Sequence, residues 1–276
     1  MSLFASMIYG FVSGLAEMFP VSAQANQMVM RQLFGVAYKE PIRDLLVHIA
    51  ILLGLFFACK DMFSKIRREQ IMAFRMRRSP SQIRALKGVY DSKLVKTAMP
   101  IMLAGLFLGL FMPNFYNRRP LFALMLLING ALNTIPVYRH QGNRDARSMT
   151  NLDGILVGLA AGLSAIPGIS RNGAVMFVAL TREADKHNGL NWALLLTVPA
   201  MAMMILLDFI SMFTVGIGAV TLMTVIGYFL SAAAAFGGAF AGVKFIRLVV
   251  HNADFAGFGY YDFGLALFSF ALYLIA

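Results

Sequence analysis

Residues 18–26 read MFPVSAQAN and residues 166–173 read IPGISRNG, and each stretch interrupts a long apolar segment near its centre. The two segments cover residues 2–35 and 153–181. Proline cannot continue a helix, and the small polar residues beside it favour turns and helix starts. We therefore expect two helical hairpins, each of which enters and leaves on the same side of the protein.

The composition places these hairpins in a membrane. Of the 276 residues, 59% are hydrophobic and 13% are charged, and the charged share is about half that of an ordinary soluble domain. Six further segments are apolar and long enough, or nearly so, to span a hydrocarbon layer about 30 Å thick. Their apolar runs do not alternate, so we expect helices rather than a barrel. They cover approximately residues 44–59, 93–112, 120–138, 192–210, 219–241 and 257–276.

The distribution of basic residues predicts which ends of the spans face the cytoplasm. The segment from Lys60 to Lys87 carries nine basic and two acidic residues, and cytoplasmic loops collect Lys and Arg. A cytoplasmic basic loop at approximately 60–92 also puts Arg144 and Lys244 inside and residues 114–119 outside. The first hairpin then opens outward and the second opens inward. The prediction is an all-α polytopic membrane protein with six transmembrane helices and two oppositely oriented re-entrant hairpins.

The two hairpins indicate an inverted repeat. GLAEMFPVS at 14–22 and GLSAIPGIS at 162–170 share Gly-Leu, a proline and a serine. We expect one membrane domain over 1–276, with repeats of approximately 1–138 and 139–276. Folds of this kind bring broken helix ends together near the midplane to form a polar site, so we expect the site where the hairpin tips meet.

The net charge of +11, from 24 basic and 13 acidic residues, fits loops that face anionic lipid. The basic region at 60–96 has little aromatic interleaving, so nucleic acid is not an expected partner. Cys59, the single cysteine, excludes an internal disulfide and a cysteine-based metal site. No basic residue precedes Arg31, so we expect the first segment to belong to the fold and not to a secretory signal. Glycines four residues apart, such as Gly10 and Gly14, are expected to let helices pack closely.

Glu17 and Arg171 are the most informative single positions. An ionisable group inside an apolar hairpin is costly and usually belongs to a functional site or pathway. The alternative is an ion pair that only ties the two hairpins together. Both interpretations place the site at these two residues.

The second tip has the features of an anion receptor. Pro167 and Gly168 end one helix, and Ser170, Arg171 and Asn172 start another. Exposed backbone N–H groups at such a start, beside a guanidinium, bind phosphate oxygens.

On the first tip, Ser22, Gln24 and Asn26 add hydroxyl and amide groups that can bind a phosphate or coordinate a cation. The alternative for each of them is helix capping. His48 lies in a predicted span, where it either faces the site or is a hydrogen-bonded packing residue. The other histidines do not cluster with it, and no metal-ligand spacing occurs.

The tips GLAEMFPVSAQAN and IPGISRNGA resemble the two signature hairpins of the undecaprenyl-diphosphate phosphatase family, the bacitracin-resistance phosphatases. The resemblance covers most of the chain and includes LVHIAILLGLFF at 46–57 and WALLLTVPAMAMMILLDF at 192–209. It implies the fold with six spans and two re-entrant hairpins, in the bacterial inner membrane.

The family removes one phosphate from the C55 lipid carrier diphosphate, usually with a divalent cation, so that the monophosphate can be reused for cell-wall precursors. The resemblance therefore implies a polyprenyl phosphate or diphosphate as the ligand, beside membrane lipids. It implies Mg²⁺ or Ca²⁺ as cofactor if the chain is catalytic, and otherwise none. It also implies a homodimer.

This chain departs from the family's pattern at several reactive positions. The first motif has two glutamates four residues apart, followed by Pro-Val-Ser-Ser-Thr-Gly-His. This chain keeps the second glutamate as Glu17, the proline as Pro20 and the first serine as Ser22. The first glutamate is replaced by Ser13, the second serine, which is the family's nucleophile, by Ala23, the threonine by Gln24 and the histidine by Asn26.

The second motif, Pro-Gly-X-Ser-Arg-Ser-Gly-Ala-Thr, is better kept. Its second serine is Asn172 and its threonine is Val175, and a Tyr-Arg pair near the C-terminus of family members appears as Tyr261-Asp262. The anion-binding half of the site is thus kept, while the half that would attack phosphorus is depleted.

These residues leave three hypotheses. In the first, the chain is a membrane phosphatase with altered residues: Glu17 acts as base or cation ligand, Ser22 as substitute nucleophile or water positioner, and Arg171 stabilises the transferred phosphoryl group. In the second, the chain binds or translocates a lipid phosphate without cleaving it. In the third, it transports an unrelated small anion.

Overall fold

The computed structural model describes residues 1–35, 40–75, 83, 85–111, 119–138, 142–216, 220–252 and 255–275. Over these residues the chain is helical, and its only strand-like pairing there is one isolated bridge between Arg144 and Ala184. The predicted outer loop at 114–119 lies, except for Arg119, outside the described residues. The helices are α1 (Leu3–Met18), α2 (Ala23–Leu33), α3 (Pro41–Ala58), α4 (Lys60–Arg75), α6 (Lys87–Gly109), α7 (Arg119–Thr134), η2 (Ile135–Tyr138), α8 (Asn151–Gly162), η3 (Leu163–Ala165), α9 (Arg171–Thr181), α10 (Lys186–Thr214), α11 (Leu222–Asn252) and α12 (Ala256–Ile275).

The first quoted stretch breaks the chain between α1 and α2, as predicted. Phe19 follows α1 in an extended conformation, and Pro20 lacks the N–H that a continuing helix would need. Ser22 then occupies the N-cap of α2, where its hydroxyl accepts a hydrogen bond from the backbone N–H of Ala25 at 3.3 Å. Capping, the alternative that the sequence left open for Ser22, is confirmed.

The second quoted stretch breaks the chain between α8 and α9 in the same way. After the short turn η3, Gly168 has φ of 102°, a backbone conformation that glycine adopts readily and other residues rarely adopt. The hydroxyl of Ser170 caps α9 by accepting a hydrogen bond from the backbone N–H of Gly173 at 3.1 Å. Each stretch therefore ends one helix and starts the next within a few residues.

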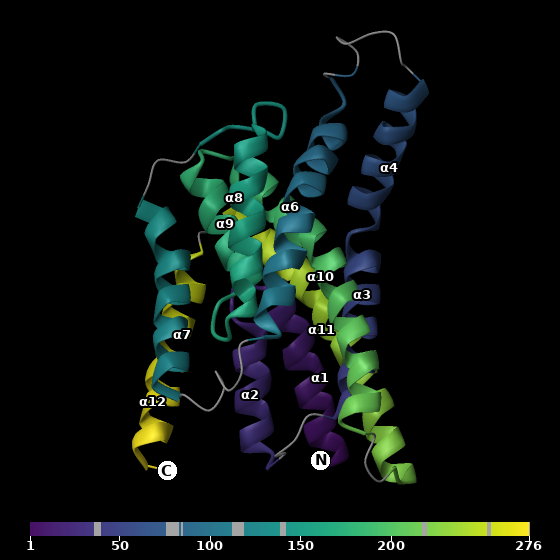
Figure 1. Ribbon diagram of the computed structural model, residues 1–276, viewed down its shortest axis with the longest axis vertical. Coiled ribbons are helices and arrows are strands. Elements are labelled where there is room, and N and C mark those ends of the chain that lie inside the picture. The colour runs from purple at the N-terminus through teal and green to yellow at the C-terminus, as the bar shows by residue number, and fades with distance from the viewer. Residues whose placement is uncertain are drawn as a thin grey trace.

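The two broken helix pairs approach each other tip to tip. Figure 1 shows α1 and α2 in the lower half of the molecule and α8 and α9 in the upper half. Asn172 Nδ2 donates to the carbonyl oxygens of Glu17 at 2.9 Å and Met18 at 3.2 Å. Asn133 Nδ2, on α7, donates to the carbonyl oxygen of Pro20 at 2.7 Å. Side-chain amides thus satisfy carbonyl groups that the helix breaks leave without helical partners.

Five helices in the described residues are long and apolar enough to cross a membrane, which agrees with the first five predicted spans. The sixth predicted span, 257–276, overlaps α12, which is not one of those five, so a crossing there remains a prediction. The chain is a multi-pass membrane protein. The five helices cover Pro41–Ala58, Lys87–Gly109, Pro120–Tyr138, Lys186–Thr214 and Leu222–Asn252.

Helices from the two halves of the chain pair across the molecule. α1 packs along α11, and α8 packs along α6. α3 contacts α10, and α7 lies beside α12. Each half therefore contributes one broken pair that rests on a long helix of the other half.

Glycines make the closest of these contacts. A Cβ atom built on Gly14 would lie 2.3 Å from the carbonyl oxygen of Ala235 on α11. A Cβ atom built on Gly158 would lie 2.5 Å from the carbonyl oxygen of Ala98 on α6. The predicted role of the glycine pairs in close helix packing is confirmed at both interfaces.

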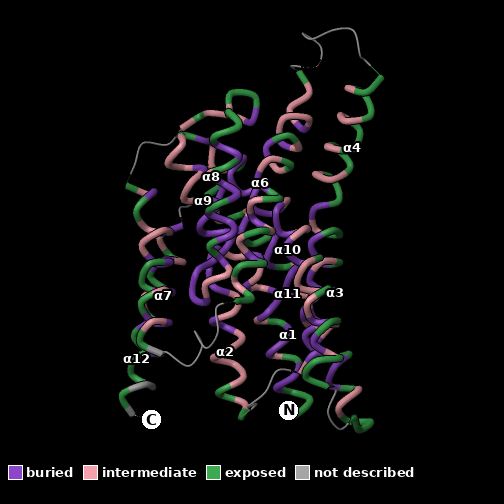
Figure 2. Tube along the Cα trace, viewed as in Figure 1, coloured by how far each residue is buried: buried purple, intermediate pink, exposed green. Residues whose placement is uncertain are grey.

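Buried residues gather in the middle of the molecule, where the broken pairs meet the long helices (Figure 2). Trp192 is among the largest fully buried side chains, and its indole N–H donates to Asp91 at 2.7 Å. Large apolar side chains such as Phe213 and Leu222 are exposed instead. An apolar exterior is expected where lipid, rather than water, surrounds the helices.

The basic segment predicted as a loop at 60–92 is mainly helical, and this corrects the prediction. α4 covers Lys60–Arg75, and α6 already begins at Lys87. The reason is that α4 is amphipathic: Met62 and Phe63 pack against the core, while most of its charged residues are exposed. Residues 76–82 and 84 lie outside the described residues.

Hydrogen bonds connect several of the basic segments that were predicted to share the cytoplasmic side. Arg247 Nη1 donates to the carbonyl oxygen of Ala58 at 3.5 Å, close to the start of α4. Lys87 Nζ donates to Asn188 Oδ1 at 2.5 Å, and Asn188 Nδ2 donates to the carbonyl oxygen of Arg144 at 3.4 Å. This arrangement agrees with the charge distribution on which the predicted topology rests.

We predict that Gly14→Ala destabilises the protein by about 1–3 kcal/mol, because the new methyl group would collide with the backbone of α11. Gly237→Ala is the matched control, since nothing lies within 4 Å of a Cβ built there. Thermal unfolding of the purified proteins in detergent measures both. Equal stability of the two variants would contradict the close α1–α11 contact.

Candidate functional site

A cavity of about 670 Å³ lies at the meeting point of the hairpin tips. Residues of α1, α2, α3, α9 and α10 contribute charged or titratable groups to its wall. Ionisable groups at this depth of a membrane protein are expensive and mark functional sites. These groups are Glu17, Arg31, Asp44, His48, Arg171 and Asp208.

The pair that the sequence singled out lies at the centre of this site. Arg171 Nη2 donates to Glu17 Oε1 at 2.7 Å and to the hydroxyl of Thr197 at 3.0 Å. The two charged side chains are 7% and 11% exposed. Arg171 Nε is buried and has no hydrogen-bond partner among the described residues. The ion pair joins the two hairpins and still leaves guanidinium donors unused.

The other predicted residues of the second tip surround this guanidinium. Ser170 and Asn172 line the cavity, whereas Gly168 is not among its lining residues and shapes the turn beneath it. The backbone N–H of Ser170 is already bound to Asn129 Oδ1 at 2.8 Å. Asn172 Oδ1 is buried without a partner in the described part of the chain.

The predicted residues of the first tip separate in the structure. Gln24 lines the cavity, and its Oε1 is buried without a hydrogen-bond partner in the described residues. Ser22 is buried, caps α2 and does not line the cavity. Asn26 turns away from the cavity: it accepts a hydrogen bond from the hydroxyl of Tyr261 and lines a second cavity. The structure therefore brings Gln24, but not Ser22 or Asn26, to the Glu17–Arg171 pair.

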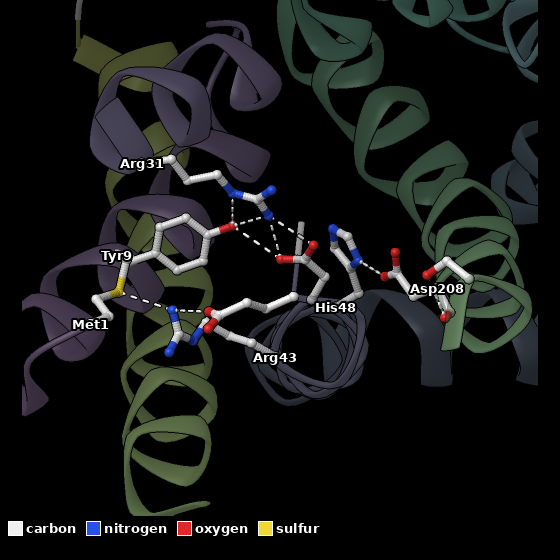
Figure 3. Close-up of polar contacts among 9 residues, drawn as sticks. Met1, Tyr9, Arg31, Arg43, His48 and Asp208 are labelled. Atoms are coloured by element: carbon white, nitrogen blue, oxygen red, sulfur yellow. Dashed lines mark hydrogen bonds and ion pairs between the residues drawn. The ribbon is translucent and has the colours of Figure 1, made fainter. Parts of the chain in front are cut away.

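A second arginine–carboxylate pair, absent from the residues singled out in the sequence, lies on the same cavity (Figure 3). Arg31 Nη2 donates to both carboxylate oxygens of Asp44, at 2.6 and 2.7 Å. The hydroxyl of Tyr9 donates to Asp44 Oδ1 at 3.1 Å and accepts from Arg31 Nη2 at 2.9 Å. Arg31 is the only charged residue of α2, and a single charge in an otherwise uncharged helix is the signal that could have identified it.

A histidine–aspartate pair completes the charged wall. His48 Nδ1 lies 2.5 Å from Asp208 Oδ2. His48 comes from α3 and Asp208 from α10, 160 positions apart in the sequence. The sequence left open whether His48 faces the site or is a hydrogen-bonded packing residue. In the structure both descriptions apply, because His48 lines the cavity and is hydrogen-bonded to Asp208.

The oxygen atoms at the tips could contribute to a cation site but do not form one alone. Glu17 and the unpartnered amide oxygens of Gln24 and Asn172 all belong to the cavity wall. In the described part of the chain, no group of three or more His, Cys, Asp or Glu residues could hold a metal ion. A cation there would need further oxygen ligands from a bound molecule.

Comparison with known proteins agrees with the resemblance that the tips indicated. The family described as bacitracin resistance protein BacA matches residues 6–268. The undecaprenyl-diphosphatase of Carboxydothermus hydrogenoformans is 27% identical over 264 residues, covering 95% of this chain and 94% of the relative. The undecaprenyl-diphosphatase of Alkaliphilus metalliredigens is 28% identical, covering 80% and 82%. Undecaprenyl-diphosphatase 1 of Shouchella clausii is 30% identical, covering 73% and 72%.

We predict that Asp44→Asn destabilises the protein by about 1.5–3 kcal/mol, because the buried Asp44 carboxylate accepts two hydrogen bonds from the partly buried Arg31, which the change leaves without its counterion. Asp145→Asn is the matched control, since the Asp145–Arg147 pair is more exposed, at 22% and 46%; it should cost less than about 1 kcal/mol. Unfolding in detergent followed by circular dichroism compares the two variants. A small loss for Asp44→Asn would show that the Arg31 pair contributes little to the fold.

Proposed function

We propose, because this chain belongs to the bacitracin resistance protein BacA family, that it binds the headgroup of a polyprenyl diphosphate lipid in the cavity between its hairpin tips. The relatives that cover most of the chain are named undecaprenyl-diphosphatase. The family reaction converts undecaprenyl diphosphate and water to undecaprenyl phosphate and phosphate. We compare the chemistry of this site with that reaction. We propose the bacterial inner membrane as its location.

The observation that carries the proposal is the state of Arg171. Its hydrogen bonds to Glu17 and Thr197 both come from Nη2. Nε is buried without a hydrogen-bond partner among the described residues, and the side chain lines the cavity. A guanidinium that is fixed on one side and free on the other suits bidentate binding of a phosphate.

A second cavity supports a lipid rather than a small anion as the ligand. This cavity, of about 610 Å³, is lined mainly by apolar residues of α1, α11 and α12. It shares Ala16, Phe19 and Val21 with the headgroup cavity. An isoprenoid chain could leave the headgroup site along this apolar wall, whereas a free anion would gain nothing from it.

Oxygen atoms of residues that line the headgroup cavity support a divalent cation as cofactor, completed by ligands from the bound diphosphate. Glu17, Gln24 Oε1 and Asn172 Oδ1 are hard oxygen donors, which Mg²⁺ and Ca²⁺ prefer. Magnesium sites of this kind commonly combine one or two carboxylates with substrate phosphates. A bound cation would offset the negative charge of the diphosphate.

The helix pairing supports the proposed membrane topology. We propose that the α1–α2 and α8–α9 pairs are re-entrant hairpins of an inverted repeat, with halves of approximately 1–138 and 139–276. The exchange of α1 onto α11 and of α8 onto α6 is what a two-fold axis between the halves would produce. Such repeats commonly hold their ligand site at the midplane.

Binding or translocation without cleavage is the second candidate function, and the first tip favours it. Ala23 stands where family members have their nucleophile, and the hydroxyl of Ser22 is used in capping α2. Ser13 stands where they have a glutamate, and its hydroxyl has no hydrogen-bond partner in the described residues. Neither serine is placed against the headgroup cavity.

We predict that Arg171→Ala weakens binding of undecaprenyl diphosphate by about tenfold to 100-fold, the equivalent of losing a charge-assisted hydrogen bond. Microscale thermophoresis of detergent-solubilised protein gives the Kd. Arg182→Ala is the matched control, because Arg182 ends the same helix α9 and pairs with Asp153, away from the cavity. Equal Kd values for Arg171→Ala and Arg182→Ala would contradict the proposed headgroup site. So would a Kd for undecaprenol, which has no phosphate, equal to the Kd for undecaprenyl diphosphate.

We predict that removing divalent cations with EDTA weakens the same binding and that added Mg²⁺ restores it. Gln24→Leu should raise the Mg²⁺ concentration needed for half-maximal restoration, because it removes an oxygen donor. Gln70→Leu on α4 serves as the control, since it lies outside the cavity. Binding that is indifferent to EDTA would argue against a cation at this site.

A further inference from the structure

The headgroup cavity holds a nitrogen base that the family's signature motifs do not account for. His48 and Asp208 both line the cavity, and their side chains meet at 2.5 Å through His48 Nδ1. The second ring nitrogen, Nε2, has no hydrogen-bond partner among the described residues. Figure 3 shows this nitrogen on the side of the ring away from Asp208, toward Arg31.

This geometry defines the proton-accepting atom. When Nδ1–H donates to the carboxylate of Asp208, the neutral imidazole carries its lone pair on Nε2. A carboxylate that orients a histidine in this way fixes both the tautomer and the direction of the lone pair. His48 therefore carries a free base on a side chain that lines the cavity in which the headgroup is proposed to bind.

The other candidates for a base in the cavity are engaged. Glu17 is bound to Arg171 at 2.7 Å, and both carboxylate oxygens of Asp44 are bound to Arg31. Asn26, which replaces the family's histidine, faces the second cavity and has no basic nitrogen.

We propose that His48, positioned by Asp208, is the general base of a diphosphate hydrolysis in which water attacks phosphorus directly. This inference rests on the proposed binding of a polyprenyl diphosphate at Arg171. It assigns the activation of the attacking group to α3 and α10, because the altered first tip lacks the family's serine nucleophile and histidine.

The step is balanced with water as the only co-reactant. The water oxygen forms a bond to the terminal phosphorus, and the water proton passes to His48 Nε2. The bond between that phosphorus and the bridging oxygen breaks, and its electron pair leaves on the bridging oxygen of the polyprenyl phosphate. The terminal group departs as inorganic phosphate, and His48 then returns its proton to solvent. The unused donors of Arg171 would stabilise the charge that develops on the phosphoryl oxygens.

Phosphate release and lipid binding, measured on the same detergent-solubilised protein with undecaprenyl diphosphate and Mg²⁺, test the inference. We expect the unaltered protein to release phosphate and His48→Ala to release it at least 100-fold more slowly, in the range of a lost general base. The Kd of His48→Ala for the lipid should stay within about threefold, since the headgroup contact at Arg171 remains. Added imidazole should restore part of the rate by occupying the space left by the ring, which a purely structural histidine would not allow. His251→Gln is the matched control, because His251 is exposed on α11 and lies outside the cavity.

Asp208→Asn provides a second variant of nearly unchanged size. As a positioning residue, Asp208 should affect kcat by at least about tenfold and leave KM unchanged. An unchanged kcat in this variant, or an unchanged rate in His48→Ala, would overturn the inference. Lipid binding without phosphate release by the unaltered protein would overturn it too, while leaving the proposed binding function intact. Absence of lipid binding by the unaltered protein would instead refute the proposed function on which the inference rests, and would overturn the inference with it.

Discussion

Two helices that end inside an apolar environment leave backbone groups without partners, and the structure is organised around satisfying them. Lipid cannot supply these hydrogen bonds, so they must come from the protein itself. Asn129, Asn133 and Asn172 supply them by binding the carbonyl oxygens at the first tip. The Glu17–Arg171 ion pair closes the same junction. Each tip is thus completed by groups from distant helices, and residues of both tips line the cavity.

The charged side chains in this cavity form pairs of opposite charge and do not create a surface of one sign. Two arginines each face a carboxylate, and the histidine faces a third carboxylate. Pairing limits the cost of burying these groups, which would be prohibitive for isolated ions. It also holds each donor and lone pair in a fixed direction before any ligand enters, which is the condition for tight binding or catalysis of a phosphate reaction.

The positions that depart from the family's pattern form contacts of their own. Asp262, where the resemblance implies an arginine, accepts hydrogen bonds from Asn129 and Asn133, the same two amides that hold the Pro20 carbonyl. Tyr261 binds Asn26, where the resemblance implies a histidine. These residues connect α12 to the first tip. The changes at both places are therefore compatible with an ordered junction and do not leave an open gap at the site.

Hydropathy, proline and charge act locally along the chain, so the sequence alone predicts the class of protein, five of the spans, the two helix breaks and the importance of Glu17 and Arg171, while it leaves their ion pair as one of two alternatives. It also indicated the family. The helices of the basic segment, the capping role of Ser22 and the second cavity beside Asn26 become visible only in the folded structure. It alone brought His48 to Asp208 and Arg31 to the same cavity as Arg171. Such pairings join residues far apart in sequence, and they depend on which faces of packed helices meet, which one sequence does not encode in any local pattern.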